Sequence, residues 1–384
     1  MAEYLSPGVF VEDTSFRSKS IDGVSTSTTG FVGPTRFGRR AGTPNLLTSL
    51  LEFEHAYGDG LPLEYGGASM PNYLWHAARA FFDNGGRQLY IARVFRPLAG
   101  PYPPPDFALA AQTTPDLYDD GHARATIGTS TQSSGAITMR ARFPGAGGNL
   151  GVQLTVNRGR NLLGGTTAAP TLTSLADHDA VWIGGTKTPR LSSTPEPGAF
   201  YLAEFDTAEQ TWRFRAKATK SPTDLRLHHR NPKLSLDPTR RTEVRVISLT
   251  VTLVYPDTRT STWDGLPLDP RHEQNGMPDS VSAVFADASS PPNGRSATPL
   301  VMTLGREITD GLALLRSLIA HKATLAGSLN HPTSTATDRS VMMTLHGGND
   351  GQRPTVGDYR GVTDAMTHAG TGLRVLEQLT RMSR

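Results

Sequence analysis

A glycine-rich pentapeptide near the C-terminus has the residue types best suited to chemistry. The run Gly347-Gly348-Asn349-Asp350-Gly351 can turn several backbone N–H groups toward an anion, or contribute oxygens to a calcium turn. It occurs once, and no Lys-Ser or Lys-Thr pair follows it as in a phosphate-binding loop. A tight turn that needs positive φ angles explains the glycines more simply, and we favour that interpretation.

Histidine and serine residues offer two further kinds of site. His228 and His229, with His178 or His272, carry metal-ligand atoms, but adjacent residues rarely share one ion. The 11 histidines and many serines allow a Ser-His-Asp trio on paper, yet the sequence has no Gly-x-Ser-x-Gly elbow. The sequence therefore predicts a protein that is not an enzyme and that needs no cofactor or metal.

Composition narrows the class of protein. The chain has 384 residues and no cysteine, which excludes disulfides, thiol catalysis and cysteine-ligated metal sites. The net charge of +3 is small, so we expect no nucleic-acid binding. The start MAEYLSPGVFVED does not resemble a signal peptide, and no apolar run reaches about 18 residues, so no membrane insertion is expected. A mild basic cluster is interpreted as a solvated loop and strand face rather than a polyanion site; it comprises Arg213, Arg215, Lys217, Lys220, Arg226, Arg230, Lys233, Arg240 and Arg241.

The first hundred residues divide into an arm and a compact part. Residues 1–20 predict an extended arm, because Pro7 and Gly8 oppose a helix and residues 9–12 alternate with strand period. Residues 21–98 predict a layered α/β core with strands at 27–32 and 89–94. Its two helices are expected to begin at the Ser49 capping box and near Pro71. One apolar helix face is expected to pack in the core; it comprises Leu74, Ala77, Ala78, Phe81 and Phe82. Helical spacing also favours the core over a groove for Tyr73 and Trp75.

The remaining sequence predicts a long β-rich insertion and a return to the core. The Pro-rich run 98–105 marks the boundary, and residues 99–345 are expected to form a mostly-β insertion. Residues 201–205 and 211–214 flank a hairpin turn, and residues 247–255 keep strict period two. Late helices are expected at 308–322 and within 362–380, the second in a returning segment, residues 346–384.

Several of these segments, in this order, resemble the contractile tail sheath family of phages, tailocins and extracellular injection systems. Tyr4–Glu12 is similar to the family's opening arm, and Gly23–Gly33 to its first core strand. The run from Pro71 to Val94 is similar to its first helix and second strand. Ala141–Gly145 with Gly148-Asn149 is similar to the turn that opens its insertion, and Leu345–Gly361 to the loop that re-enters the core. Each motif is weak alone, and their joint order carries the resemblance.

The resemblance implies a structural subunit of a phage-tail-like particle. Such subunits form a homo-oligomer of sixfold rings around an inner tube protein, capped by a baseplate and a tail terminator, and contract to drive the tube through a target envelope. They are made in the cytoplasm and reach the outside within the particle or virion tail. The arm residues implied to join neighbouring subunits by β-strand exchange are Tyr4, Leu5, Pro7, Gly8, Val9, Phe10, Val11 and Glu12. The residues implied to form structural turns are Pro144, Gly145, Gly148, Asn149, Gly347, Gly348, Asp350 and Gly351.

The expected fold class is therefore an α/β (α+β) inner core interrupted by a large mostly-β insertion. In the family, further core strands follow the segment that matches Gly372–Leu379, whereas this sequence stops at Arg384. We expect a truncated or split sheath product, or a piece of one, with a core incomplete at the C-terminus. Two alternatives remain: a surface-exposed binding or adhesion module of such a particle, and a secreted hydrolase.

Overall fold

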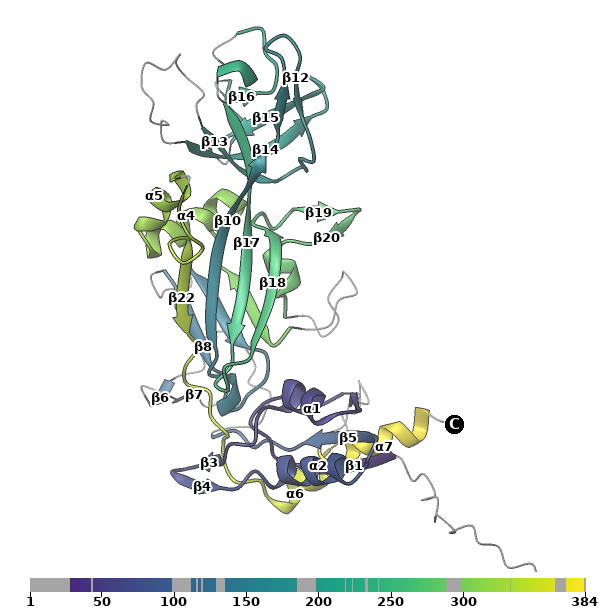
Figure 1. Ribbon diagram of the computed structural model, residues 1–384. Helices are drawn as coiled ribbons and strands as arrows, with labels where there is room; N and C mark the ends of the chain where they lie inside the picture. The colour runs from purple at the N-terminus through teal and green to yellow at the C-terminus, as the bar shows by residue number, and fades with distance from the viewer. Residues whose placement is uncertain are drawn as a thin grey trace, which may run out of the picture.

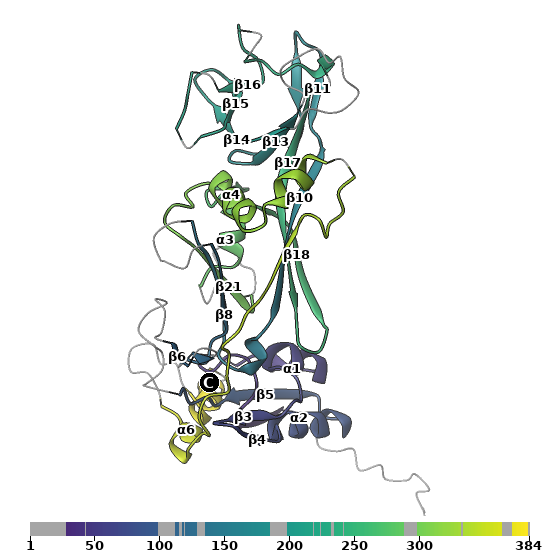
Figure 2. The ribbon, with the colours of Figure 1, turned by 90° about the vertical axis from the view of Figure 1, so that its left-hand side faces the viewer.

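The chain forms an elongated molecule with a small α/β base and a long lobe that rises from it (Figures 1 and 2). The computed structural model describes residues 28–42, 44–98, 112–114, 117–118, 120–128, 135–184, 198–217, 219–222, 224–231, 234–240, 242–287, 298–331, 333–362 and 371–382. We call residues 28–98 with 346–382 the base, and residues 120–345 the lobe. The arm at residues 1–20, with its eight predicted contact residues, lies outside the described residues.

The base is a three-stranded sheet with helices on it, as Figure 1 shows. Its strand order is β1-β5-β2, with β1 parallel to β5 and β2 antiparallel. The base elements are β1 (Thr28–Gly33), β2 (Leu46–Leu47), α1 (Leu50–Tyr57), β3 (Leu63–Tyr65), β4 (Ala68–Met70), α2 (Tyr73–Asp83), β5 (Gln88–Arg93), α6 (Val356–Arg360) and α7 (Leu373–Met382). Because α7 contacts β5, the base is built from two sequence segments that the lobe separates.

The helix caps in the base lie close to the positions predicted from the sequence, with small differences. Ser49 accepts from the Glu52 amide, and Gly58 ends α1 with a φ of 89°. The Glu52 carboxylate reaches back to the Thr48 amide at 2.7 Å, one residue before the position that a capping box would use. Helix α2 begins two residues after Pro71, because Asn72 serves as its N-cap.

The expected core face of α2 is only partly correct. Leu74 and Ala78 are buried, and Phe81 and Phe82 are partly buried. Ala77 is exposed.

The described part of the lobe contains one large sheet, one small three-stranded sheet and two short two-stranded sheets. The large sheet has the order β16-β15-β14-β13-β17-β10-β22, and β18 also pairs with β17. Its strands are β10 (Gly151–Asn161), β13 (Ala180–Gly184), β14 (Ala199–Asp206), β15 (Thr211–Arg215), β16 (Leu225–Arg226), β17 (Glu243–Val254), β18 (Thr260–Pro267) and β22 (Ser340–Thr344). The small sheet has the order β21-β9-β8, from β21 (Leu300–Leu304), β9 (Ile137–Ala141) and β8 (Arg124–Ile127). The structure thus confirms a mixed α/β chain, with the predicted hairpin at β14–β15.

Shorter elements complete the described chain, and all but the first two of them lie within the lobe. They are β6 (Gln112–Thr114), β7 (Leu117–Tyr118), η1 (Ala146–Gly148), β11 (Leu163–Gly165), β12 (Pro170–Leu172), η2 (Pro238–Arg240), β19 (Glu273–Gln274), β20 (Met277–Pro278), α3 (Val281–Val284), α4 (Gly311–His321) and α5 (Thr324–Asn330). The predicted late helix corresponds to α4 and begins at Gly311, because Asp310 caps it by accepting from the Ala313 amide.

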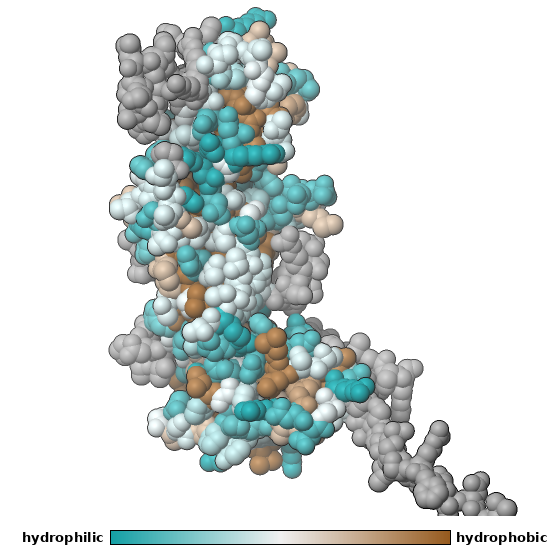
Figure 3. Space-filling view, viewed as in Figure 1, coloured by the Kyte–Doolittle hydropathy of each residue, from teal (hydrophilic) through white to brown (hydrophobic). Residues whose placement is uncertain are grey.

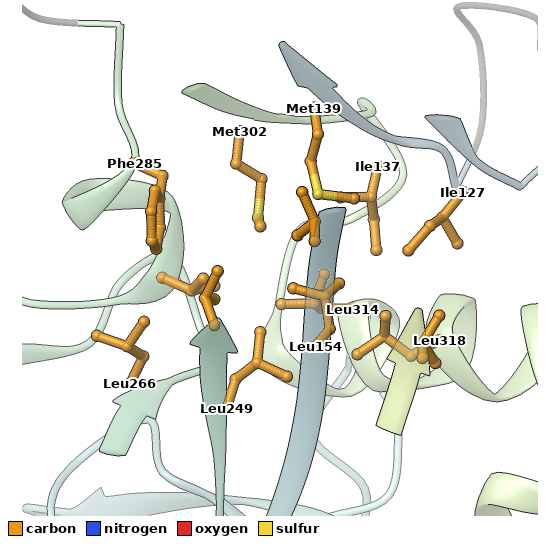
Figure 4. Packing of buried hydrophobic residues seen from close by; sticks show 14 of the residues in the cluster. Ile127, Ile137, Met139, Leu154, Leu249, Leu266, Phe285, Met302, Leu314 and Leu318 are labelled. Atoms are coloured by element: carbon orange, nitrogen blue, oxygen red, sulfur yellow. The ribbon is translucent and has the colours of Figure 1, made fainter. Parts of the chain in front are cut away.

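The lobe has two apolar cores along its length. In the middle, the small sheet faces β10, β17 and β18 across a core that α4 closes (Figure 4). Strand β17 shows why this core forms, because Ile247, Leu249, Val251 and Leu253 are buried while the residues between them are partly exposed. A second core, built around Val181, Ala203 and Phe214, holds the outer part, which comprises β11 to β16 and the start of β17.

Candidate functional site at the neck and on the base

The turn residues predicted from the sequence meet at the neck, where the base joins the lobe. Asn149 and Gly348 exchange two hydrogen bonds of 2.9 Å, although they are far apart in the sequence. The Gly145 amide donates to the Gly121 carbonyl at 2.9 Å, and the Asn349 amide donates to the same carbonyl at 3.3 Å. The two chain segments that leave and re-enter the base are therefore tied to each other.

Asp350 is the central acceptor of the neck. One carboxylate oxygen accepts from the Ala146 amide at 2.9 Å, and the other accepts from the Glu64 amide at 3.0 Å. Burial raises the pKa of Asp350, and these two hydrogen bonds together with Arg36 and Arg93 oppose the rise. Because each carboxylate oxygen accepts from a backbone N–H group, Asp350 connects η1 of the lobe to β3 of the base.

Two glycines of the predicted turns are required by close backbone approach. Gly145 has a φ of 128°, and a Cβ there would lie 2.0 Å from the Arg36 carbonyl oxygen. Gly351 has a φ of 76°, and a Cβ there would lie 2.0 Å from the Arg96 carbonyl oxygen. Any other residue at either position would have to push the neck apart, which agrees with the preferred interpretation of the glycine-rich run as a tight turn.

A fully buried arginine organises the base side of the neck. Arg93, 1% exposed, ends β5 and donates to the carbonyls of Thr35 and Gly38, each at 2.9 Å. Arg36 forms an ion pair with Asp59 at 2.7 Å. These contacts hold the loop after β1 against the lobe turn at Gly145 and Gly147, since the Gly147 amide donates to the Arg36 carbonyl at 2.9 Å.

The candidate metal ligands do not converge. Among the described residues, no three His, Asp or Glu side chains are arranged to hold a metal ion. His272 lies instead between two carboxylates: its Nδ1 is 2.6 Å from Asp279 and its Nε2 is 3.5 Å from Asp179. Burial lowers the pKa of His272, but the hydrogen bonds to Asp179 and Asp279 outweigh it and raise the pKa to about 9. This histidine is therefore a cation at neutral pH, with both nitrogens facing acceptors.

Three arginines of the basic cluster in the outer part are paired with carboxylates within the fold. Arg215 pairs with Glu204, and Arg226 pairs with Glu209 at 2.6 Å. Arg213 pairs with Asp206 at 2.6 Å. The expectation of a solvated face is therefore wrong for Arg215 and Arg226, which are buried. Their charge is balanced by carboxylates that hairpin pairing and the β14–β15 turn bring beside them.

Exposed apolar side chains gather on the base, as the brown areas of Figure 3 around α1 show. Of the eleven large apolar side chains that are well exposed in the described part of the chain, eight belong to the base: Leu46, Leu51, Leu61, Tyr73, Val356, Tyr359, Val362 and Leu373. Tyr73 is 66% exposed, so its expected place in the core is wrong. Tyr73 lies in the first turn of α2. Helical spacing predicts its position around the helix, but it does not predict whether another part of the chain covers its side chain. In the described residues, the base therefore carries more of the well-exposed large apolar side chains than the lobe does.

The base sheet also has an open edge. Within the described residues, β1 pairs only with β5, so its other edge carries no strand. Most residues of β1 are exposed or half-buried, and α7 lies against the adjacent β5. An edge strand with unpaired N–H and C=O groups is a template for strand addition.

Comparison with known proteins leaves the family open. No family model and no curated protein matches the sequence. In the described part of the chain, none of the helices has both the length and the apolar character that a bilayer span requires.

Proposed function

We propose that this chain is a structural subunit of a contractile tail sheath. The observation that carries the proposal is that β1, within the described residues, is an edge strand of a base rich in exposed apolar side chains. The segment that precedes β1 in the sequence contains the arm motif Tyr4–Glu12. An arm of this kind adds to the base sheet of a neighbouring copy, and the apolar base surface is covered in the assembled ring.

The base then serves as the inner core of the sheath, interrupted by the lobe. In the described residues its sheet has three strands, and the arm of a neighbouring copy adds a further strand to it. The base faces the inner tube, the lobe points outward, and the baseplate and terminator bound the assembled sheath. The particle is assembled in the cytoplasm and acts outside it.

Contraction requires many weak contacts between subunits and a subunit that moves as a rigid body. Each backbone hydrogen bond of an added strand stabilises the contact by about 1 kcal/mol, so one arm contributes only a few kcal/mol and the lattice persists through many arms in series. The neck hydrogen bonds let the base and lobe turn together. The free energy of contraction is then the difference between two packings of the same subunit.

The adhesion alternative rests on one feature of the lobe. Phe205 is 40% exposed and packs edge-on against Trp212 with ring centroids 5.4 Å apart, in the outer part that Figure 1 shows farthest from the base. An exposed Phe205 backed by the half-buried Trp212 at that place suits contact with a target surface. It is a second candidate, and it is compatible with a lobe that belongs to a sheath.

Removal of the arm tests the proposed strand exchange. A chain lacking residues 4–13, co-produced with the tube protein and with any C-terminal complement, is expected to stay dispersed, because the neighbour's sheet edge receives no strand. Sedimentation and electron microscopy of the lysate measure polymer formation. The matched control replaces residues 4–13 by an equally long Gly-Ser segment, which keeps the length and removes the apolar alternation. Sheath-like polymers from either variant at the wild-type level contradict the proposal.

A further inference from the structure

A small hairpin projects sideways from the lobe without contributing to either core. Strands β19 and β20 are joined by Asn275 and Gly276, whose φ angles of 55° and 75° are those of a type I′ turn. Residues 273–277 are all exposed, and Met277 is 53% exposed. Figure 1 shows the hairpin extending away from the lobe on the side of β18. Two isolated strands are only marginally stable, so something else must hold this hairpin in place.

The root of the hairpin is fixed by the charged cluster at His272. His272 precedes β19 and Asp279 follows β20, so their 2.6 Å contact closes the hairpin at its base. Asp179, directly before β13, lies 3.5 Å from the other ring nitrogen of the imidazole. On the loop before the hairpin, Arg271 and Asp269 pair with each other, and Asp269 also accepts from the Gly311 amide at 3.0 Å. These contacts fix the root of the hairpin to the body of the lobe, while its turn stays exposed.

The opposite side of the lobe offers a complementary surface. In the described residues, β22 is an edge strand of the large sheet, and its Met342 is 67% exposed. Next to it, the Lys322 amine donates to the Ser340 carbonyl at 2.7 Å and blocks that end of the edge. Lys322 and Arg339, both half-buried, outnumber the exposed Asp338 beside them, so these residues give the flank a net positive charge, whereas the hairpin carries Glu273. Figure 1 places β22 and the hairpin on opposite sides of the lobe.

We propose that the β19–β20 hairpin docks on the β22 flank of a second copy of this chain. The two surfaces differ and lie on opposite sides of one molecule, so the contact is head-to-tail and can close a ring. Glu273 then meets the Lys322 and Arg339 flank, and Met277 meets Met342. This proposal rests on the proposed function, because it assigns a lateral contact between lobes within a ring of sheath subunits.

Engineered cysteines test the contact cleanly, because the chain has none of its own. In an Asn275→Cys, Met342→Cys double variant, mild oxidation of purified assembled particles is expected to give a ladder of covalent oligomers on a non-reducing gel, which collapses to monomer on reduction. The matched control is Asn275→Cys with Thr262→Cys, since Thr262 lies on β18 at the other edge of the sheet. That pair, and Asn275→Cys alone, are expected to give no ladder.

The outcomes separate this inference from the proposed function. Striated particles that contain the double variant but yield no ladder overturn the hairpin contact and leave the sheath proposal standing. A chain that forms no particles under any condition contradicts the sheath proposal itself. A charge-reversed Glu273→Lys chain is expected to lower the yield of the ladder several-fold, whereas the charge-neutral Glu273→Gln chain is expected to lower it less. An unchanged yield in the Glu273→Lys chain contradicts the predicted charge pairing.

Discussion

Replacement of Asp350 by alanine is expected to lower the free energy of unfolding of the chain by about 3 kcal/mol. Asp350 is 4% exposed, and its two oxygens accept from the Ala146 and Glu64 amides. The variant leaves both donors without this acceptor at the joint between lobe and base. Burial of the charge, which raises the pKa of Asp350, offsets part of what those hydrogen bonds contribute, so the loss falls below the sum of two charged hydrogen bonds.

Urea denaturation of the dispersed chain measures this effect, with two variants as references. Asp350→Asn keeps one acceptor oxygen but turns an NH₂ group toward the second amide, so we expect about half the loss. Asp338→Ala is the matched control, because Asp338 also accepts from a backbone amide, that of Thr335 at 2.9 Å, but is exposed. It is expected to cost far less than Asp350→Ala. Equal losses for the two alanine variants would mean that the neck carboxylate has no special role.

Stability is expected to fall as the pH rises through about 9, because of His272. The folded protein holds the pKa of His272 at about 9, above its ordinary 6.5. The folded state therefore binds this proton more tightly than the unfolded state does. The stabilisation is fully present below about pH 6.5 and is lost as the pH rises through about 9; its full size is about 3 kcal/mol.

Thermal melts between pH 6 and pH 10 check this dependence. His272→Gln removes the titrating group, so it is expected to melt at a lower temperature than wild type at pH 7 and to match it more closely at pH 10. Asp279→Asn keeps the imidazole and removes one carboxylate, which shifts the fall in stability to lower pH. Parallel melting curves for wild type and His272→Gln across this range are incompatible with a charged His272 that stabilises the fold.

Local signals in the sequence identified much of the fold. Ser49 and Gly58 mark the ends of α1 through side-chain and backbone geometry that depends only on near neighbours. The strict alternation from Ile247 to Leu253 likewise identified β17, because one face of that strand packs on a core. The glycine-rich turns were also identified, since positive φ angles restrict the residue type.

The contacts between distant segments could not be predicted. Asp350 accepts from Glu64, 286 residues away, and no local pattern encodes that pairing. The charged state of His272 could not be predicted either, because its contact with Asp179 joins residues that are far apart in the sequence. Exposed Tyr73 has the same helical spacing that a core residue would have, so its place on the surface depends on what the rest of the chain covers.

Electron microscopy of this chain co-produced with its tube protein, and with any C-terminal complement, tests the proposed assembly most directly. We predict striated tubes of uniform width in which sixfold rings of this subunit surround the inner tube. Dispersed chains beside bare inner tubes, with every component present and folded, would contradict it.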